Sequence, residues 1–154
     1  MAVIIKPDDL NSEAVSAIVA THLSFARASS PACQAFALDV EALKAPEMSF
    51  WVAWWNAKTP VGCCGLLARE GGFGEIKSMH TLEAHRGHGI GALLVDHVLK
   101  EAGRRGYGRV GLETGKGEPF FPARRLYARA GFVACDAFPP YENDTFSYCM
   151  MRAV

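Results

Sequence analysis

The residues with the clearest chemical potential form a glycine-rich segment, Arg86-Gly87-His88-Gly89-Ile90-Gly91. The segment follows a predicted strand, 73–81, and opens a predicted amphipathic helix, 90–105. Glycines at such a junction let the backbone turn tightly and approach a ligand closely. The first N–H groups of a helix have no partner within it, and the helix dipole adds positive potential, so a phosphate or pyrophosphate is favoured there. The Arg86 guanidinium would add charge-assisted hydrogen bonds to phosphate oxygens.

Three other interpretations of this segment compete with that one. It could be a glycine-rich turn that binds no ligand. A phosphate loop of the nucleotidase type is disfavoured because no Lys-Ser or Lys-Thr pair follows the glycines. A dinucleotide fingerprint fits better, since Gly87-x-Gly89-x-x-Ala92 has its spacing and Glu113 lies at the end of the next strand. That fingerprint usually opens a fold of several βαβ units, and only one crossover is found here, so an NAD-dependent oxidoreductase is less favoured.

A second segment changes the balance between these interpretations. Residues 123–132 read as a short helix that ends in Gly131-Phe132 and is followed by a strand. Together with Arg-x-x-Gly-x-Gly upstream, this segment resembles the GNAT superfamily of N-acetyltransferases. Residues 79–94 match the coenzyme-A motif of that family, and Leu126-Tyr127 through Gly131-Phe132 match its second motif. The resemblance covers roughly residues 60–150 and is weak before 50. It implies direct transfer of an acetyl group from acetyl-CoA to a primary amine of a small molecule or peptide.

The resemblance also implies which residues contact coenzyme A. The loop 86–91 would wrap the pyrophosphate with backbone N–H groups, and His88 would act only through its backbone. The strand ending near Met79 and Thr81 would splay from its neighbour and pair with the pantetheine arm. The backbone N–H of Met79 would polarise the thioester carbonyl. Ala123 matches a family alanine, but Phe120 stands where many members carry a pantetheine-binding asparagine, so we expect an apolar wall there.

Two side chains are expected to move protons. Tyr127 matches the general acid of the family, which protonates the departing thiolate; the alternative is a core tyrosine that fixes its helix. Glu75 resembles the glutamate that serves as general base in histone-type members; the alternative is an exposed carboxylate paired with Lys77 or Arg69. His80 is the second candidate base, since histidine titrates near neutrality. A water chain without a single base would also serve.

The acceptor side is less informative. By the resemblance, the acceptor approaches over the N-terminal helices and the last hairpin, a region that includes Phe25, Trp51, Trp54 and the loop 138–141. Trp51 and Trp54 are expected in the core, and Tyr141 is the better candidate for an exposed aromatic contact with an amine. A non-catalytic acyl-CoA-binding module on the same fold is the second functional alternative, which the presence of Tyr127 and Glu75 disfavours.

The predicted elements follow the order strand, helices, three meandering strands, helix, strand, helix and two strands. The predicted strands cover residues 3–5, 50–55, 61–68, 73–81, 109–113, 132–137 and 145–151. The predicted helices cover residues 10–23, much of the stretch between Pro31 and Pro46, 90–105 and 122–130. The apolar stripe of the helix 90–105 is expected at Ile90, Leu93, Leu94, Val98 and Ala102. This order predicts an α/β (α+β) fold with a mixed, mostly antiparallel central sheet, flanked by helices, and one parallel pair splayed at the cofactor site.

Composition limits the number of domains, the possible partners and the location of the protein. The chain has 154 residues with 16 Lys and Arg against 16 Asp and Glu, which predicts one domain, 1–154, and argues against nucleic-acid or membrane partners. No apolar run approaches the roughly 18 residues that cross a bilayer, and no signal peptide is recognised, so we expect a cytoplasmic protein. Five cysteines without a CxxC pair suit reduced thiols, with Cys63 and Cys64 buried. His22, His85 and His97 are expected at the surface, and no metal is predicted. A homodimer is compatible with the resemblance.

Overall fold

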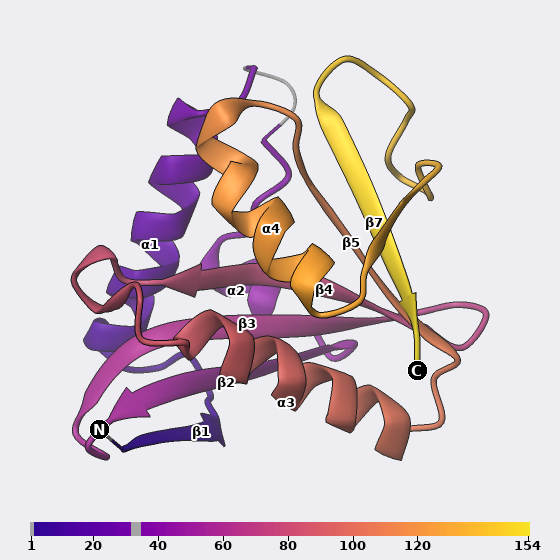
Figure 1. The fold of residues 1–154 in the computed structure, drawn as a ribbon. Helices are drawn as coiled ribbons and strands as arrows, with labels where there is room; N and C mark the ends of the chain where they lie inside the picture. Colours follow the sequence, from indigo (N-terminus) through magenta and orange to yellow (C-terminus); the bar gives the residue numbers. More distant parts are fainter. Residues whose placement is uncertain (1, 32–34) are drawn as a thin grey trace.

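The fold is a single twisted sheet with helices on both faces (Figure 1). The computed structural model describes residues 2–31 and 35–154. Its strands are β1 (Val3–Pro7), β2 (Met48–Trp55), β3 (Thr59–Arg69), β4 (Phe73–Thr81), β5 (Arg109–Gly115), β6 (Val133–Cys135) and β7 (Ser147–Ala153). Its helices are α1 (Glu13–Ala28), α2 (Val40–Leu43), α3 (Ile90–Arg104) and α4 (Phe121–Arg129), with short 3-10 turns η1 (Glu83–His85) and η2 (Glu118–Phe120).

The strand order across the sheet is β1-β2-β3-β4-β5-β7-β6. Every neighbouring pair is antiparallel except β4 and β5, which run parallel and are connected through α3. A parallel pair requires such a crossover, whereas antiparallel neighbours can be joined by tight turns. The predicted fold class is therefore confirmed.

Two apolar clusters hold the helices on the sheet. Trp51 and Ala53 of β2 belong to the cluster under α3 and α4, whereas Phe50 and Val52 belong to the cluster under α1 and α2. Successive side chains of a strand point to opposite faces, so a continuous apolar run indicates a strand covered on both sides. The adjacent Cys63-Cys64 pair follows the same rule, and both thiols are buried, as expected.

The parallel pairing of β4 and β5 is short. It joins Phe73 with Arg109, Gly74 with Val110 and Glu75 with Gly111, and it ends there although β4 continues to Thr81 and β5 to Gly115. Beyond this point, the register between β3 and β4 shifts, which marks a β-bulge. At the bulge Ser78 has a φ of 54°, a conformation that bends a strand out of its ladder. The two strands therefore diverge and leave a split in the sheet.

The helix expected between Pro31 and Pro46 is the main error of the sequence analysis. The structure has only the four-residue α2 there, residues 35–39 form no helix, and residues 32–34 lie outside the described part. Leu38 and Val40 pack against the cluster under α1, so tertiary contact, not helical periodicity, places these apolar residues. Asp39 caps α2 by accepting a hydrogen bond from the Ala42 N–H at 2.8 Å.

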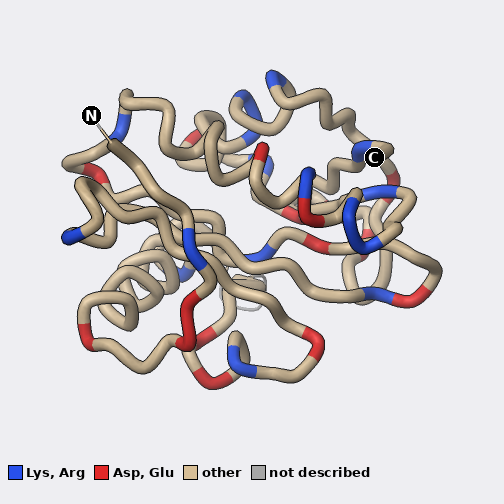
Figure 2. The backbone as a smooth tube through the Cα atoms, turned by 90° about the horizontal axis from the view of Figure 1, so that it is seen from below, with Lys and Arg blue, Asp and Glu red and all other residues tan. Residues whose placement is uncertain are grey.

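Two general properties of the chain are the distribution of its charged residues and the length of its helices. Basic and acidic residues are interspersed along the backbone (Figure 2), in keeping with the formal net charge of zero. In residues 2–31 and 35–154, no helix is both long and apolar enough to cross a bilayer.

The two sides of α3 differ in what they contribute to stability. The predicted stripe was wrong at Leu93, which is 43% exposed, and it omitted the buried Val95. We expect Leu94→Ala, on the buried side of α3, to lower the free energy of unfolding by about 2–5 kcal/mol, because it removes fully buried methyl groups and leaves a cavity. The matched control Leu93→Ala should change it by about 0.5 kcal/mol or less. Urea unfolding measures both, and equal losses would contradict the assignment of the core.

Candidate active site

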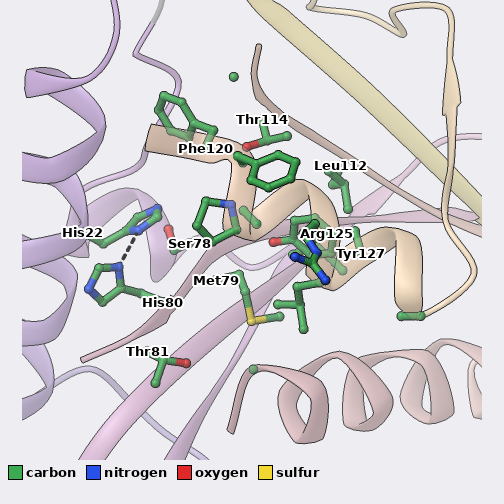
Figure 3. Close-up of a pocket in the computed structure, with 18 of the residues that line it drawn as sticks. His22, Ser78, Met79, His80, Thr81, Leu112, Thr114, Phe120, Arg125 and Tyr127 are labelled. Carbon is green, nitrogen blue, oxygen red and sulfur yellow. Dashed lines mark hydrogen bonds between the residues drawn. The ribbon is translucent and has the colours of Figure 1, made fainter. Parts of the chain in front are cut away.

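A cavity of about 900 Å³ occupies the split between β4 and β5. The start of α3 and the side of α4 line one part of it, and α1 lines another (Figure 3). In the view of Figure 3, His22 and His80 lie on one side, Tyr127 and Arg125 on the other, and Ser78 and Met79 between them. The cavity therefore brings together residues from the first and last thirds of the chain.

The glycine-rich segment forms one end of the cavity. Gly87 and Gly89 have φ values of 83° and 77°, a region that side chains rarely adopt, and a Cβ at either position would meet only open space. Gly89 is the N-cap of α3, so the first N–H groups of that helix open next to the cavity. The Nε of Arg86 donates to the Thr81 carbonyl at 3.1 Å, which ties the loop to the end of β4.

The bulged end of β4 forms the floor of the cavity. Ser78, Met79 and Thr81 all line it. The Cys63 thiol donates to the Ser78 carbonyl at 3.2 Å and so fixes the bulge from the neighbouring strand. Because a bulge takes backbone groups out of the ladder, the main chain around Met79 is directed away from regular pairing with β3.

The wall opposite β4 comes from η2 and α4. Phe120, Ala123 and Tyr127 line the cavity, and the Phe120 ring packs edge-on against Phe25 and Phe146 at centroid distances of 5.3 and 5.7 Å. Phe120 therefore supplies an apolar wall. Tyr127 is only 5% exposed, and burial raises the pKa of its hydroxyl well above the ordinary value, so the phenol stays protonated at neutral pH.

Glu75 does not lie among the described residues that line the cavity. Its side chain is completely buried, and its two carboxylate oxygens have different partners. Oε1 accepts from the Nε of Arg69 at 2.9 Å, and Oε2 accepts from the Tyr141 hydroxyl at 2.5 Å and lies 3.2 Å from the Lys77 ammonium. The structure thus places Glu75 as the internal counter-ion of Arg69 and Lys77.

Tyr141 corrects another expectation. It was predicted as an exposed aromatic residue, but it is 6% exposed, because its hydroxyl is bonded to both Lys77 and Glu75. Burial raises the pKa of the Tyr141 hydroxyl well above its ordinary range, and the Glu75 carboxylate raises it further. The loop before β7 is thereby fastened to the middle of the sheet.

Glu113 is a cavity residue that the sequence analysis did not place in the site. It lies near the end of β5 and lines the cavity, and in the described chain its buried Oε2 has no hydrogen-bond partner. Burial raises the pKa of the Glu113 carboxyl to about 7, and the charges of Glu75 and Asp144 act in the same direction; the Ser147 hydroxyl and the Lys77 ammonium lower it. The sequence offered one signal for this placement. Glu113 ends the predicted strand 109–113, which was expected to splay from the strand 73–81 at the cofactor site.

His22 and His80 form a pair at the α1 side of the cavity. Their Nδ1 atoms lie 3.0 Å apart, so one ring donates to the other. His22 was expected at the surface, but burial lowers its pKa to about 4, with a smaller contribution from His80. Burial likewise lowers the pKa of His80 to about 4, and the Arg86 charge adds to this effect. Both imidazoles are neutral at pH 7, but a pKa of about 4 makes His80 a weak proton acceptor, which disfavours it as the base.

Among residues 2–31 and 35–154, no group of three or more His, Cys, Asp or Glu side chains is arranged to ligate a metal ion. His85 and His97, predicted at the surface, are half-buried.

Comparisons with known proteins agree with this geometry. Residues 16–132 match the family model described as "Acetyltransferase (GNAT) family". The sequence is 39% identical over 148 residues to the uncharacterized N-acetyltransferase YsnE of Bacillus subtilis, which covers 96% of this chain and 97% of that protein.

Solved structures show the same fold. A protein of Klebsiella pneumoniae assigned as an acyl-CoA N-acyltransferase superposes with a TM-score of 0.80 at 24% identity, covering 98% of this chain and 97% of the other. A GNAT family acetyltransferase of Elizabethkingia anophelis, solved with acetyl-CoA bound, superposes with a TM-score of 0.70 at 19% identity, covering 99% and 98% of the two chains.

The environment of Glu113 predicts an unusual titration. We expect one glutamate carboxyl carbon, followed by ¹³C NMR, to titrate with a midpoint near the pKa of about 7 that burial imposes on Glu113. The signal should disappear in Glu113→Gln. In Lys77→Gln the midpoint should rise, because the Lys77 ammonium lowers the pKa of Glu113. A midpoint near 4.5 would show that Glu113 is solvated.

Proposed function

The chain belongs to the GNAT acetyltransferase family, and we propose that it transfers an acetyl group from acetyl-CoA directly to a primary amine of a small molecule or peptide. The observation that carries the proposal is the split between β4 and β5, which opens onto the N-terminus of α3 at one end and onto ionisable side chains at the other. One cavity can therefore hold an anionic carrier and an acceptor amine side by side.

The residues present fit coenzyme A. Open space beside Gly87 and Gly89 lets a pyrophosphate approach the backbone, and Arg86 lies next to them. Arg125 and Arg129 also line the cavity and offer further cations for phosphate groups. Past Glu75, the edge of β4 that faces the split is free of β5, so its backbone can pair with the amides of a pantetheine arm. Bound acetyl-CoA supplies the thioester carbonyl that is attacked and the thiolate that leaves.

The chain supplies an acid and a polarising group on the carrier side. We assign Tyr127 as the general acid, because it lines the cavity and its phenol is protonated at neutral pH, so that a proton is at hand for a departing thiolate. The backbone N–H of Met79, at the bulge, would polarise the carbonyl oxygen.

The base belongs on the acceptor side. An amine reaches the site as an ammonium ion and must lose a proton before it attacks. Glu113 is favoured over Glu75, because Glu113 lines the cavity with an unpaired oxygen whereas both oxygens of Glu75 are already bonded. As the nitrogen–carbon bond forms and the carbon–sulfur bond breaks, the amine gives up two protons. One replaces the proton that Tyr127 gives to sulfur, and the other leaves through Glu113 to solvent.

Carrier binding is tested first. Acetyl-CoA and coenzyme A should raise the melting temperature by several degrees at saturating concentration, and NAD should not, because only a ligand of the folded state stabilises it. Gly89→Asp should abolish the shift by placing a carboxylate beside the phosphate site. Gly71→Asp is the matched control, since Gly71 has a similar φ of 83° and equally open surroundings in the β3–β4 turn. Stabilisation by NAD alone would favour the oxidoreductase alternative.

Proton transfer is tested by thiol release from acetyl-CoA with a panel of primary amines. We expect kcat/KM to rise as pH increases through about 7, because Glu113 must lose its proton to act as a base. Glu113→Gln should remove this rise and lower kcat/KM by about 10²-fold or more, and Tyr127→Phe should lower kcat by a similar factor.

Glu75→Gln separates the two carboxylates. It should weaken the fold more than it changes the pH profile, because it leaves Arg69 and Lys77 without their buried counter-ion. Glu113→Gln should remain folded and gain stability at pH 8. A carboxyl whose pKa is raised from 4.5 to about 7 on folding lowers stability as the pH rises between those two values, and an amide does not. A pH rise that survives in Glu113→Gln but not in Glu75→Gln would assign the base to Glu75. Binding of acetyl-CoA without turnover of any amine would favour a non-catalytic module.

A further inference from the structure

Lys77 and Glu113 occupy matching positions on the two sides of the split. Glu75 and Gly111 are the last paired residues of β4 and β5, and Lys77 and Glu113 each lie two residues farther along. Because side chains alternate along a strand, both lie on the face opposite Ile76, which packs in the cluster under α3. Both line the cavity. A cation and an anion thus flank the divergence of the strands from opposite sides.

The Lys77 ammonium has N–H donors that its protein partners do not all use and that can serve a ligand in the cavity. Its ammonium donates to the Tyr141 hydroxyl at 2.5 Å and lies 3.2 Å from Glu75, and an ammonium has three N–H donors. Glu75 is shared with Arg69, so two cations surround one carboxylate. This side of the cavity therefore has an excess of positive charge, and its Lys77 side chain is 12% exposed.

The two charges do not neutralise each other directly. In the described chain, the Lys77 ammonium contacts Glu75 and Tyr141, and the buried Oε2 of Glu113 has no hydrogen-bond partner. A buried carboxylate oxygen without a partner is costly, and the cost is relieved by a ligand that brings a donor. A ligand with one ammonium and one carboxylate on the same carbon would satisfy both sides of the split at once.

Aromatic side chains surround the rest of the acceptor side. Phe25, Phe36, Phe120 and Phe146 line the cavity. Phe36 packs edge-on against Tyr141 at a centroid distance of 5.0 Å, next to the Lys77 ammonium. These rings offer apolar surface close to the charged pair, which suits an apolar substituent and disfavours a long polar one.

We propose that the acceptor is a free α-amino acid with an apolar side chain, whose carboxylate is bound by Lys77 and whose α-ammonium is bound and deprotonated by Glu113. The inference rests on the proposed function and specifies its substrate class. Acetylation converts the ammonium into a neutral amide, so the product loses its ionic contact with Glu113 while the Lys77 contact is kept. Lys77 is then the residue that distinguishes an amino acid from the corresponding amine.

The test compares matched ligand pairs by isothermal titration into the protein saturated with coenzyme A. The amino acids are L-phenylalanine, L-leucine and L-methionine, and each is paired with its decarboxylated amine: 2-phenylethylamine, 3-methylbutylamine and 3-(methylthio)propylamine. We expect at least one amino acid to bind about tenfold or more tightly than its amine, the scale of a hydrogen bond to a charged group. Lys77→Gln should remove this preference and Lys77→Arg should keep it.

Lys100→Gln is the control for loss of a lysine, because Lys100 lies on the exposed side of α3 and pairs with Asp96 at 2.9 Å. It should leave the preference unchanged. The proposal is overturned if the amines bind as tightly as the amino acids, if neither class binds, or if the preference survives in Lys77→Gln. Failure of the proposed function is recognised separately, because it would appear as no thermal stabilisation by acetyl-CoA and no thiol release.

Discussion

The end of pairing between β4 and β5 at Glu75 and Gly111 is the constraint on which the site depends. A sheet that continued to pair would leave no room between these strands. Two features coincide at the divergence: the bulge at Ser78, and the buried carboxylate of Glu75. Glu75 joins Arg69 at the end of β3, Lys77 on β4 and Tyr141 in the loop before β7, so one side chain fixes three segments around the point where the split begins.

The divergence gives the cavity two sides with different chemical groups. On the face covered by α3 and α4, the glycine loop and the helix N-terminus supply backbone donors, and Tyr127 lies beside them. On the other face, α1 and the loop before β7 supply aromatic rings and ionisable groups. An acyl carrier and an acceptor can then meet through the opening without competing for the same surface, which is what direct transfer requires.

Two carboxylates on neighbouring strands, Glu75 and Glu113, have different chemistry because their surroundings differ. Glu75 is bonded through both oxygens to cations and a phenol, so it acts as part of the framework. Glu113 has one unpartnered oxygen and faces the cavity, and burial raises its pKa to about 7. Environment, not residue type, separates the structural acid from the candidate base. Environment also decides the protonation state of His80. Its ring is neutral because it is buried against His22.

Local rules of turn chemistry and periodicity were enough to predict several elements from the amino-acid sequence. The glycine segment and α3, the α4 helix ending before Gly131, and the mixed sheet with one parallel pair all follow from turn chemistry and periodicity, and Tyr127 and Phe120 follow from the second motif. The sequence did not determine the short α2, the burial of Tyr141 and His22, or which glutamate faces the cavity. Each of these depends on how residues distant in the chain are brought together. Leu38 packs on the cluster under α1, Tyr141 is bonded to Glu75, and His22 lies against His80. Lys77 and Glu113 lie on opposite strands of the split. Spacing along one strand cannot show where its neighbour stops pairing, and that is the point at which a buried carboxylate becomes either an internal counter-ion or a group that lines the cavity.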